Sequence, residues 1–121
     1  MTKFKVEIVK RNGRPVGVRA AQINGRIITL ALQDEPERMN WFSASYQAIP
    51  SIEEWFAISE NFDAINDACE QAGGEPLKKD CYWSASEARH DYALYYDFNR
   101  ISGLNFDEKP FRHNVRVIVN F

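Results

Sequence analysis

The residues of this chain with the types needed for a reaction are serines, histidines and cysteines. His90 precedes Asp91, but adjacent residues of an extended chain point in different directions, so Asp91 is badly placed to orient a histidine base. Ser84 and Ser86 lack the Gly-x-Ser-x-Gly sequence that presents a nucleophilic serine. We therefore expect His90 to be an exposed loop residue and both hydroxyls to be structural. The prediction is that the protein is not an enzyme and has no catalytic residues.

Two cysteines, Cys69 and Cys81, lie 12 residues apart without a histidine at the spacing of a zinc site. Cys69 falls on the apolar side of a predicted helix, where a free thiol acts as a small hydrophobic group. The N-terminus is charged where a secretory signal would be apolar, which favours reduced thiols. Free cysteines are the expected state, and a disulfide is the alternative.

Four carboxylates in the C-terminal third raise the question of a Ca²⁺ site. They do not have the regular acidic spacing of such a site, and Lys109 and Arg112 are placed to neutralise the nearest pair. We therefore expect solvated loop charges, with no bound metal and no cofactor. The four carboxylates are Asp91, Asp97, Asp107 and Glu108.

Aromatic and arginine side chains after residue 88 give the strongest functional signal. Strand alternation places about half of the aromatic side chains in the core, and Tyr96 and Phe98 are assigned there. The others, with Arg89, Arg100 and Arg112, match the composition of interface hot spots, and aromatic faces also suit sugar rings. This composition predicts recognition of a protein or glycan. The aromatic residues are Tyr92, Tyr95, Tyr96, Phe98, Phe106 and Phe111.

Bulk properties limit the class of protein. A chain of 121 residues, 45% hydrophobic and 26% charged, predicts one globular domain. The net charge of −2 and the mixing of acidic with basic residues argue against a nucleic-acid partner. No apolar run is long enough for a bilayer span, so membrane insertion is not expected. The oligomeric state stays open.

The first third of the chain predicts an antiparallel meander within residues 4–32. Alternating apolar residues indicate strands at 4–9, 16–23 and 26–32. The pairs Asn12-Gly13 and Asn24-Gly25 are typical of tight hairpin turns.

The middle of the chain, residues 40–73, predicts helices. A short helix is expected over 40–48, and Ser51 with Glu54 forms a capping box that begins the next one. Ile52, Trp55, Phe56 and Ile58 are expected to face inward. A further helix over 62–72 buries Ile65, Ala68, Cys69 and Ala72 and ends at Gly73-Gly74.

The last part, residues 81–121, predicts strands and display loops. Strands are expected at 82–86, 93–98 and 115–121, with loops around Gly103, Asn105 and Pro110. Strands at both ends with helices between them predict the α+β class.

Three sequence blocks resemble a known family. They are Ile-Pro-Ser-Ile-Glu-Glu-Trp at 49–55, Tyr-Trp-Ser-Ala-Ser-Glu at 82–87 and Val-Arg-Val-Ile-Val-Asn-Phe at 115–121. Over residues 26–121 the chain resembles C-type-lectin-like proteins of the bacterial and phage surface-display type, whose fold is shared with formylglycine-generating enzymes. Ala85 departs from the family block, and the catalytic cysteine pair of those enzymes and the calcium motifs of animal lectins are absent.

The resemblance implies one C-type-lectin-like domain over residues 1–121, with antiparallel sheet elements from both chain ends and two to three helices between them. It also implies an exposed loop at 88–92, a display face at Tyr95, Asp97 and Asn99, and an irregular rim from Arg100 to Arg112. The expected ligand-binding residues are Arg89, His90, Tyr92, Tyr95, Asp97, Asn99, Arg100, Phe106 and Arg112.

The leading hypothesis is a non-enzymatic display domain that binds a protein or glycan through residues 88–113. The alternative is a structural or assembly subunit of a phage particle or surface appendage. An enzyme derived from the formylglycine-generating scaffold is a third reading. Without a secretory signal, the expected location is cytoplasmic or phage-associated unless the sequence is truncated.

Overall fold

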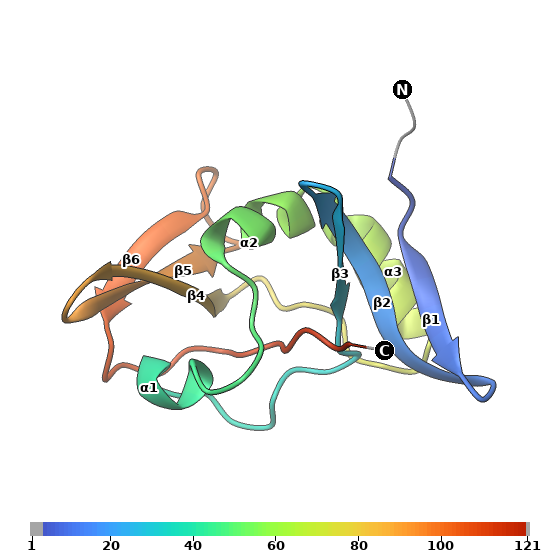
Figure 1. The fold of residues 1–121 in the computed structure, drawn as a ribbon, viewed down its shortest axis with the longest axis horizontal. Coiled ribbons are helices and arrows are strands. Elements are labelled where there is room, and N and C mark those ends of the chain that lie inside the picture. The colour runs from blue at the N-terminus through green and yellow to red at the C-terminus, as the bar shows by residue number, and fades with distance from the viewer. Residues whose placement is uncertain (1–3, 121) are drawn as a thin grey trace.

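The computed structural model describes residues 4–120, and its elements run in the order strands, helices, strands. Figure 1 shows two sheets at opposite ends of an elongated molecule, with α2 between them. The predicted α+β class is confirmed. The elements are β1 (Glu7–Arg11), β2 (Arg14–Ile23), β3 (Arg26–Leu30), α1 (Trp41–Ala44), α2 (Ile52–Ser59), α3 (Phe62–Gln71), β4 (Cys81–Arg89), β5 (Tyr92–Asp97) and β6 (Leu104–Glu108).

The first sheet is the predicted meander, β1-β2-β3, and both of its strand pairs are antiparallel. Its two turns have positive φ at each central residue, 53° and 77° at Asn12 and Gly13, and 50° and 77° at Asn24 and Gly25. These are the dihedrals that twist a two-residue hairpin in the right sense, and Asn-Gly adopts them with little strain. The strand predicted at 4–9 was placed too early, since β1 runs from Glu7 to Arg11, and the strand predicted at 26–32 was too long, since β3 ends at Leu30.

The second sheet, β4-β5-β6, is also antiparallel. Tyr82 pairs with Tyr96, and Leu94 pairs with Phe106. The prediction of a loop around Asn105 was wrong, because this residue lies within β6. Alternation decides the structure here: Leu104 and Phe106 lie on one face of the strand, although Asn and Asp at the intervening positions disfavour strands.

The first helix is much shorter than the predicted 40–48. The Asn40 side chain accepts a hydrogen bond of 2.9 Å from the Ser43 N–H, but only one turn follows. Pro50 disfavours helical dihedrals at the residue before it, and the extended chain presents the Ala48 carbonyl to the Ile118 N–H at 2.7 Å. No helix within residues 4–120 is long and apolar enough to cross a membrane.

The capping box of α2 is confirmed. The Ser51 hydroxyl accepts from the Glu54 N–H at 3.2 Å, and the Glu54 carboxylate accepts from the Ser51 N–H at 2.8 Å. Phe56 is an exception to the predicted inward stripe, because 37% of its surface is exposed. Its ring meets the Tyr96 ring edge-on at 5.5 Å, so it borders the core without entering it.

Two apolar cores lie on opposite faces of the second sheet. The larger joins the first sheet, α2 and α3 to Tyr82 and Tyr96, whose rings gather around Trp55. The smaller contains Trp83 and Tyr95 with α1 and the end of the chain. The base of β4 and β5 is therefore buried on both sides, which fixes the direction in which the rest of the sheet projects.

The C-terminal segment, residues 113–119, lies between the two sheets (Figure 1). The predicted strand at 115–121 is wrong for the described residues, which form only isolated bridges, and residue 121 lies outside the described range. Hydrogen bonds connect the segment to β3 (Val119 N–H to Thr29 O, 2.9 Å) and to β4 (Asn114 N–H to Cys81 O, 3.1 Å). One short stretch of backbone thus holds both sheets together.

Candidate recognition site

The free end of the second sheet carries exposed apolar and charged side chains on the face that continues from the larger core. We call this surface the tip face. Near its base, Tyr96 is buried, but two register positions further along β5, Leu94 is only half-buried and its partner Phe106 is 59% exposed. The core thus opens into a surface as the sheet extends beyond α2. The tip face consists of Ala88, Arg89, Tyr92, Leu94, Phe106 and Glu108.

One hollow on the tip face holds about 250 Å³ and is lined by Ala88, Arg89, Tyr92 and Phe106. The Tyr92 and Phe106 rings meet edge-on at 5.7 Å and 78°, forming two walls of a corner. Among the described residues, nothing pairs with the Arg89 guanidinium. The hollow therefore combines aromatic walls with an uncompensated positive charge.

A second hollow, of about 320 Å³, is also lined by Tyr92. Glu108 and Asp91 are among its lining residues, and the Glu108 carboxylate has no partner within residues 4–120. Tyr92 lines both hollows, of which the first is also lined by Arg89 and the second by Asp91 and Glu108. The lining is completed by Phe42, Lys109 and Pro110.

Lys109 does not contribute a free charge to this surface, because its ammonium group connects β4 to the turn that follows it. Its side chain is 6% exposed, and its ammonium donates to Glu87 at 2.7 Å and to the His90 carbonyl at 2.6 Å. It also lies 4.6 Å from the centre of the Trp41 ring. The expectation that Lys109 neutralises Asp107 and Glu108 was wrong.

No family model matches this chain, and comparison with curated proteins and with solved structures finds no similar one. The site is therefore interpreted from its own geometry.

Tyr95 does not lie on the display face where it was expected. It is 9% exposed on the opposite face of β5, its ring stacks on His113 at 4.5 Å and 27°, and Trp83 meets it edge-on at 6.1 Å. Burial, and then the nearby Cys81, raise the pKa of its hydroxyl. His113 in turn contacts the Asp107 carboxylate at 2.8 Å. These residues stabilise the second core.

The remaining predicted site residues do not form one surface. Asp97 and Arg100, 3.7 Å apart as an ion pair, lie at the opposite end of β5 from Tyr92, and Asn99 donates to the Lys79 carbonyl at 2.7 Å. Arg112 is exposed and unpaired among the described residues. Of the nine predicted residues, only Arg89, Tyr92 and Phe106 share a hollow.

The candidate catalytic side chains have structural partners. The Ser84 hydroxyl donates to the Leu94 carbonyl at 2.7 Å, and the Ser86 hydroxyl accepts from the Ile52 N–H at 3.0 Å, as expected for structural hydroxyls. His90 is exposed as predicted, but Asp91 does reach it, at 3.0 Å, so the argument that adjacent residues point apart fails in this turn.

Both cysteines are free. Burial and the neighbouring Asp97 raise the pKa of the Cys81 thiol to about 11, so the thiolate needed for a nucleophile is scarce at neutral pH. Burial also raises the pKa of Cys69, against the opposing effect of Arg116. Within residues 4–120, no group of three or more His, Cys, Asp or Glu side chains is arranged to hold a metal ion.

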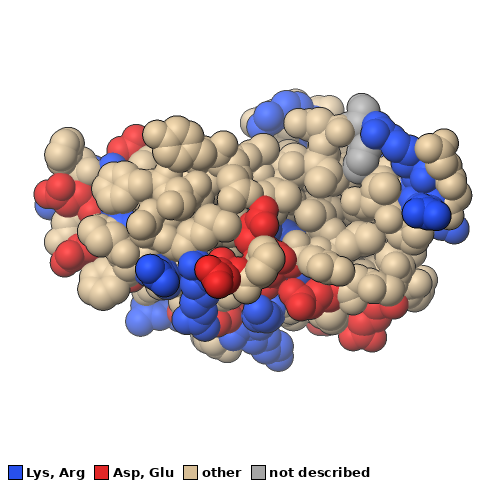
Figure 2. Space-filling model, turned by 90° about the horizontal axis from the view of Figure 1, so that it is seen from below, with Lys and Arg blue, Asp and Glu red and all other residues tan. Residues whose placement is uncertain are grey.

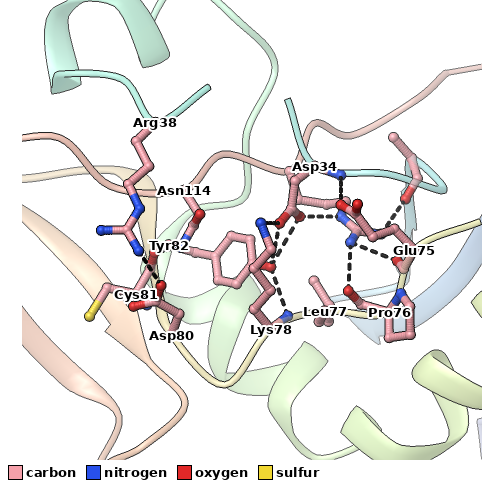
Figure 3. Close-up of polar contacts among 12 residues, drawn as sticks. Asp34, Arg38, Glu75, Pro76, Leu77, Lys78, Asp80, Cys81, Tyr82 and Asn114 are labelled. Atoms are coloured by element: carbon pink, nitrogen blue, oxygen red, sulfur yellow. Dashed lines mark hydrogen bonds and ion pairs between the residues drawn. The ribbon is translucent and has the colours of Figure 1, made fainter. Parts of the chain in front are cut away.

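A buried polar network, which the sequence analysis did not find, lies beneath the segment that links the sheets (Figure 3). Arg116 donates to the Asp34 carboxylate at 2.7 Å and to the Glu75 carbonyl at 2.8 Å. The Tyr82 hydroxyl donates to Asp34 at 2.9 Å and accepts from the Lys78 N–H. Every buried side-chain polar atom among the described residues has a partner, so this network serves structure and leaves no group for a ligand.

The charges visible from the side of α1 are mixed. Figure 2 shows Lys and Arg side chains lying beside Asp and Glu side chains, with a broad uncharged area next to them. A larger hollow, of about 800 Å³, separates residues 4–8 from α3, but Phe4 is the one aromatic ring among its lining residues and no arginine lines it. The tip face is the better candidate for recognition, because it combines rigid aromatic walls with unpaired charges.

Proposed function

We propose that this protein is a non-enzymatic binding domain that recognises a protein or glycan through its tip face. The observation that carries the proposal is the hollow in which the unpaired Arg89 guanidinium adjoins the rings of Tyr92 and Phe106. Aromatic and arginine side chains on a rigid support are typical of interface hot spots. The base of the sheet is packed on both faces and Lys109 fastens its tip, so little ordering is needed on binding.

A C-type-lectin-like fold is the finer structural proposal. It is supported by the pairing of the C-terminal segment with β3, which brings sheet elements from both ends of the chain together, and by the helices between them. In this proposal, the β4–β5 turn and β6 form the display region.

A structural or assembly subunit is the second candidate function. The outer edge of β6 is unpaired within the described residues, and exposed apolar side chains lie on this strand and in the segments before and after it. Such a surface also suits a fixed contact between subunits. These side chains are Ile101 (108% exposed), Leu104 (44%) and Phe111 (54%).

The test is a screen of the purified chain on glycan and protein arrays, with Phe106→Ser and Ile101→Ser variants beside it. Phe106 walls the hollow, whereas Ile101 is an equally apolar residue outside it. We expect binding that is lost with Phe106→Ser and kept with Ile101→Ser, at unchanged melting temperatures. Equal binding by both variants would place recognition elsewhere. No binding, together with a stable oligomer in solution, would favour the subunit.

A further inference from the structure

Three side chains of the tip face form a row across the second sheet. Tyr92 on β5 is the register partner of Arg89 on β4 and of Glu108 on β6. Across this row the sheet therefore presents a cation, an aromatic ring and an anion. Each charged group has no partner among the described residues.

The two charges of the row form no ion pair with each other or with another described residue. Neighbouring strands lie about 4.8 Å apart, so the backbone positions of Arg89 and Glu108 are separated by roughly 10 Å. Tyr92 lies between them in the strand register and lines both hollows. A ligand that covers the whole row contacts the positive charge of Arg89 at one end and the negative charge of Glu108 at the other.

We infer that the tip face binds a peptide segment of another protein in which an acidic and a basic side chain flank an apolar one. The acidic group pairs with Arg89, the apolar side chain fills the corner between Tyr92 and Phe106, and the basic group faces Glu108 and Asp91. This inference rests on the proposed function and narrows its ligand to one class.

The negative end of the row favours a peptide over a glycan. Asp91 and Glu108 both line the second hollow, while the charge of Lys109 is already matched by Glu87 at 2.7 Å. Sugars bearing carboxylate or sulfate groups suit Arg89 but place their charge near two carboxylates. Polypeptides supply cations and anions on one short segment, and such complementarity fixes orientation and excludes wrong partners.

The experiment selects binders from a displayed library of random linear peptides on the immobilised chain and measures the enriched peptides by calorimetry. Two charge reversals, Arg89→Glu and Glu108→Lys, test the row. Arg14→Glu and Glu70→Lys make the same changes at exposed positions outside the tip face, in β2 and α3.

We expect enriched peptides to carry both charges around an apolar residue. Each reversal in the row should weaken binding about tenfold, or about 1.4 kcal/mol, while the matched controls change it little. Replacing the acidic residue of the peptide by lysine should restore binding to Arg89→Glu.

Other outcomes separate this inference from the proposed function. Peptides or glycans that lose binding with Phe106→Ser but ignore both reversals would overturn the inference and leave the binding function standing. If no peptide is enriched but a glycan binds at the tip face, the peptide inference is also overturned and the binding function stands. If neither library nor array yields a binder, both proposals fall.

Discussion

Burial changes the chemistry of individual residues on the second sheet. Cys81 begins β4 opposite Asp97, and burial with this neighbouring carboxylate disfavours the thiolate. Tyr95, one strand away, is likewise kept protonated by burial. Tyr92, on the same strand as Tyr95, stays half-buried beside two hollows. The two tyrosines lie on opposite faces of β5: Tyr95 is packed in the smaller core, whereas Tyr92 lies on the tip face, beyond the larger core.

Alkylation tests the Cys81 environment. The pKa shift from 9.0 to about 11 should slow modification by iodoacetamide at pH 8 about 100-fold relative to the chain unfolded in urea, since the thiolate reacts. Mass spectrometry of the peptide containing Cys81 measures both rates separately from those of Cys69. Equal rates in the folded and unfolded chain would contradict the burial argument.

The same shift has a consequence for stability. Between pH 9 and about 11 the unfolded chain loses the Cys81 proton while the folded chain keeps it. The free energy of unfolding should therefore fall as pH rises through this range.

At the scale of elements, β6 limits how the second sheet meets other chains. The hydrogen bonds from Lys109 N–H to Asp91 O and from Asp97 N–H to Gly103 O show that the N–H groups of Phe106 and Glu108 point toward the open edge. The Asn105 and Asp107 side chains accept from these two groups at 2.8 and 2.9 Å. Edge donors covered in this way are poor templates for another strand.

Asn105→Val should allow the open edge of β6 to pair with a second copy of the chain. The substitution uncovers the Phe106 N–H and adds a β-branched side chain, so we expect concentration-dependent dimers in sedimentation velocity runs. Arg19→Val is the control, because it adds the same side chain at an exposed position of the central strand β2 that pairs with Glu7 of β1 and with Thr29 of β3. A monomeric Asn105→Val protein would show that the covered donors do not control association.

Local signals in the sequence predicted the elements that local interactions determine. The two Asn-Gly turns and the Ser51–Glu54 box need only residues close in sequence. The length of α1 and the pairing of the C-terminal segment depend on contacts between distant residues, for which one sequence gives no signal. The strand β6 does alternate in the sequence, but Asn105 and Asp107 disfavour strands and concealed it. In the site, alternation identified Tyr96 as a core residue, but the burial of Tyr95 follows from the second core on the other face, which was not foreseen.

For the molecule as a whole, the Asp34–Arg116 pair connects segments that are remote in sequence. Arg116 also donates to the carbonyls of Ala31 and Pro76, so one side chain holds the chain after β3, the loop before β4 and the C-terminal segment. Both charged side chains are at most 2% exposed. Removing either one leaves the other buried with fewer partners.

Arg116→Met should lower the free energy of unfolding by about 3–5 kcal/mol, because the Asp34 carboxylate keeps only Lys78 and Tyr82. Urea denaturation followed by tryptophan fluorescence measures the change. The double variant Asp34→Asn/Arg116→Met removes the unpaired charge and should recover part of the loss. A double variant as unstable as the sum of its single changes would contradict this explanation.

The position of the C-terminal segment also orders events during synthesis of the protein. Residues 113–119 leave the ribosome after every strand of both sheets, yet they supply the backbone that joins β3 to β4. Each hairpin can form as it emerges and the larger core can join the two sheets, but the hydrogen bonds from residues 113–119 to β3 and β4 form only after this segment is released. A product that stops before Asn114 carries the tip face on a sheet that lacks these hydrogen bonds and is joined to the first sheet through the larger core.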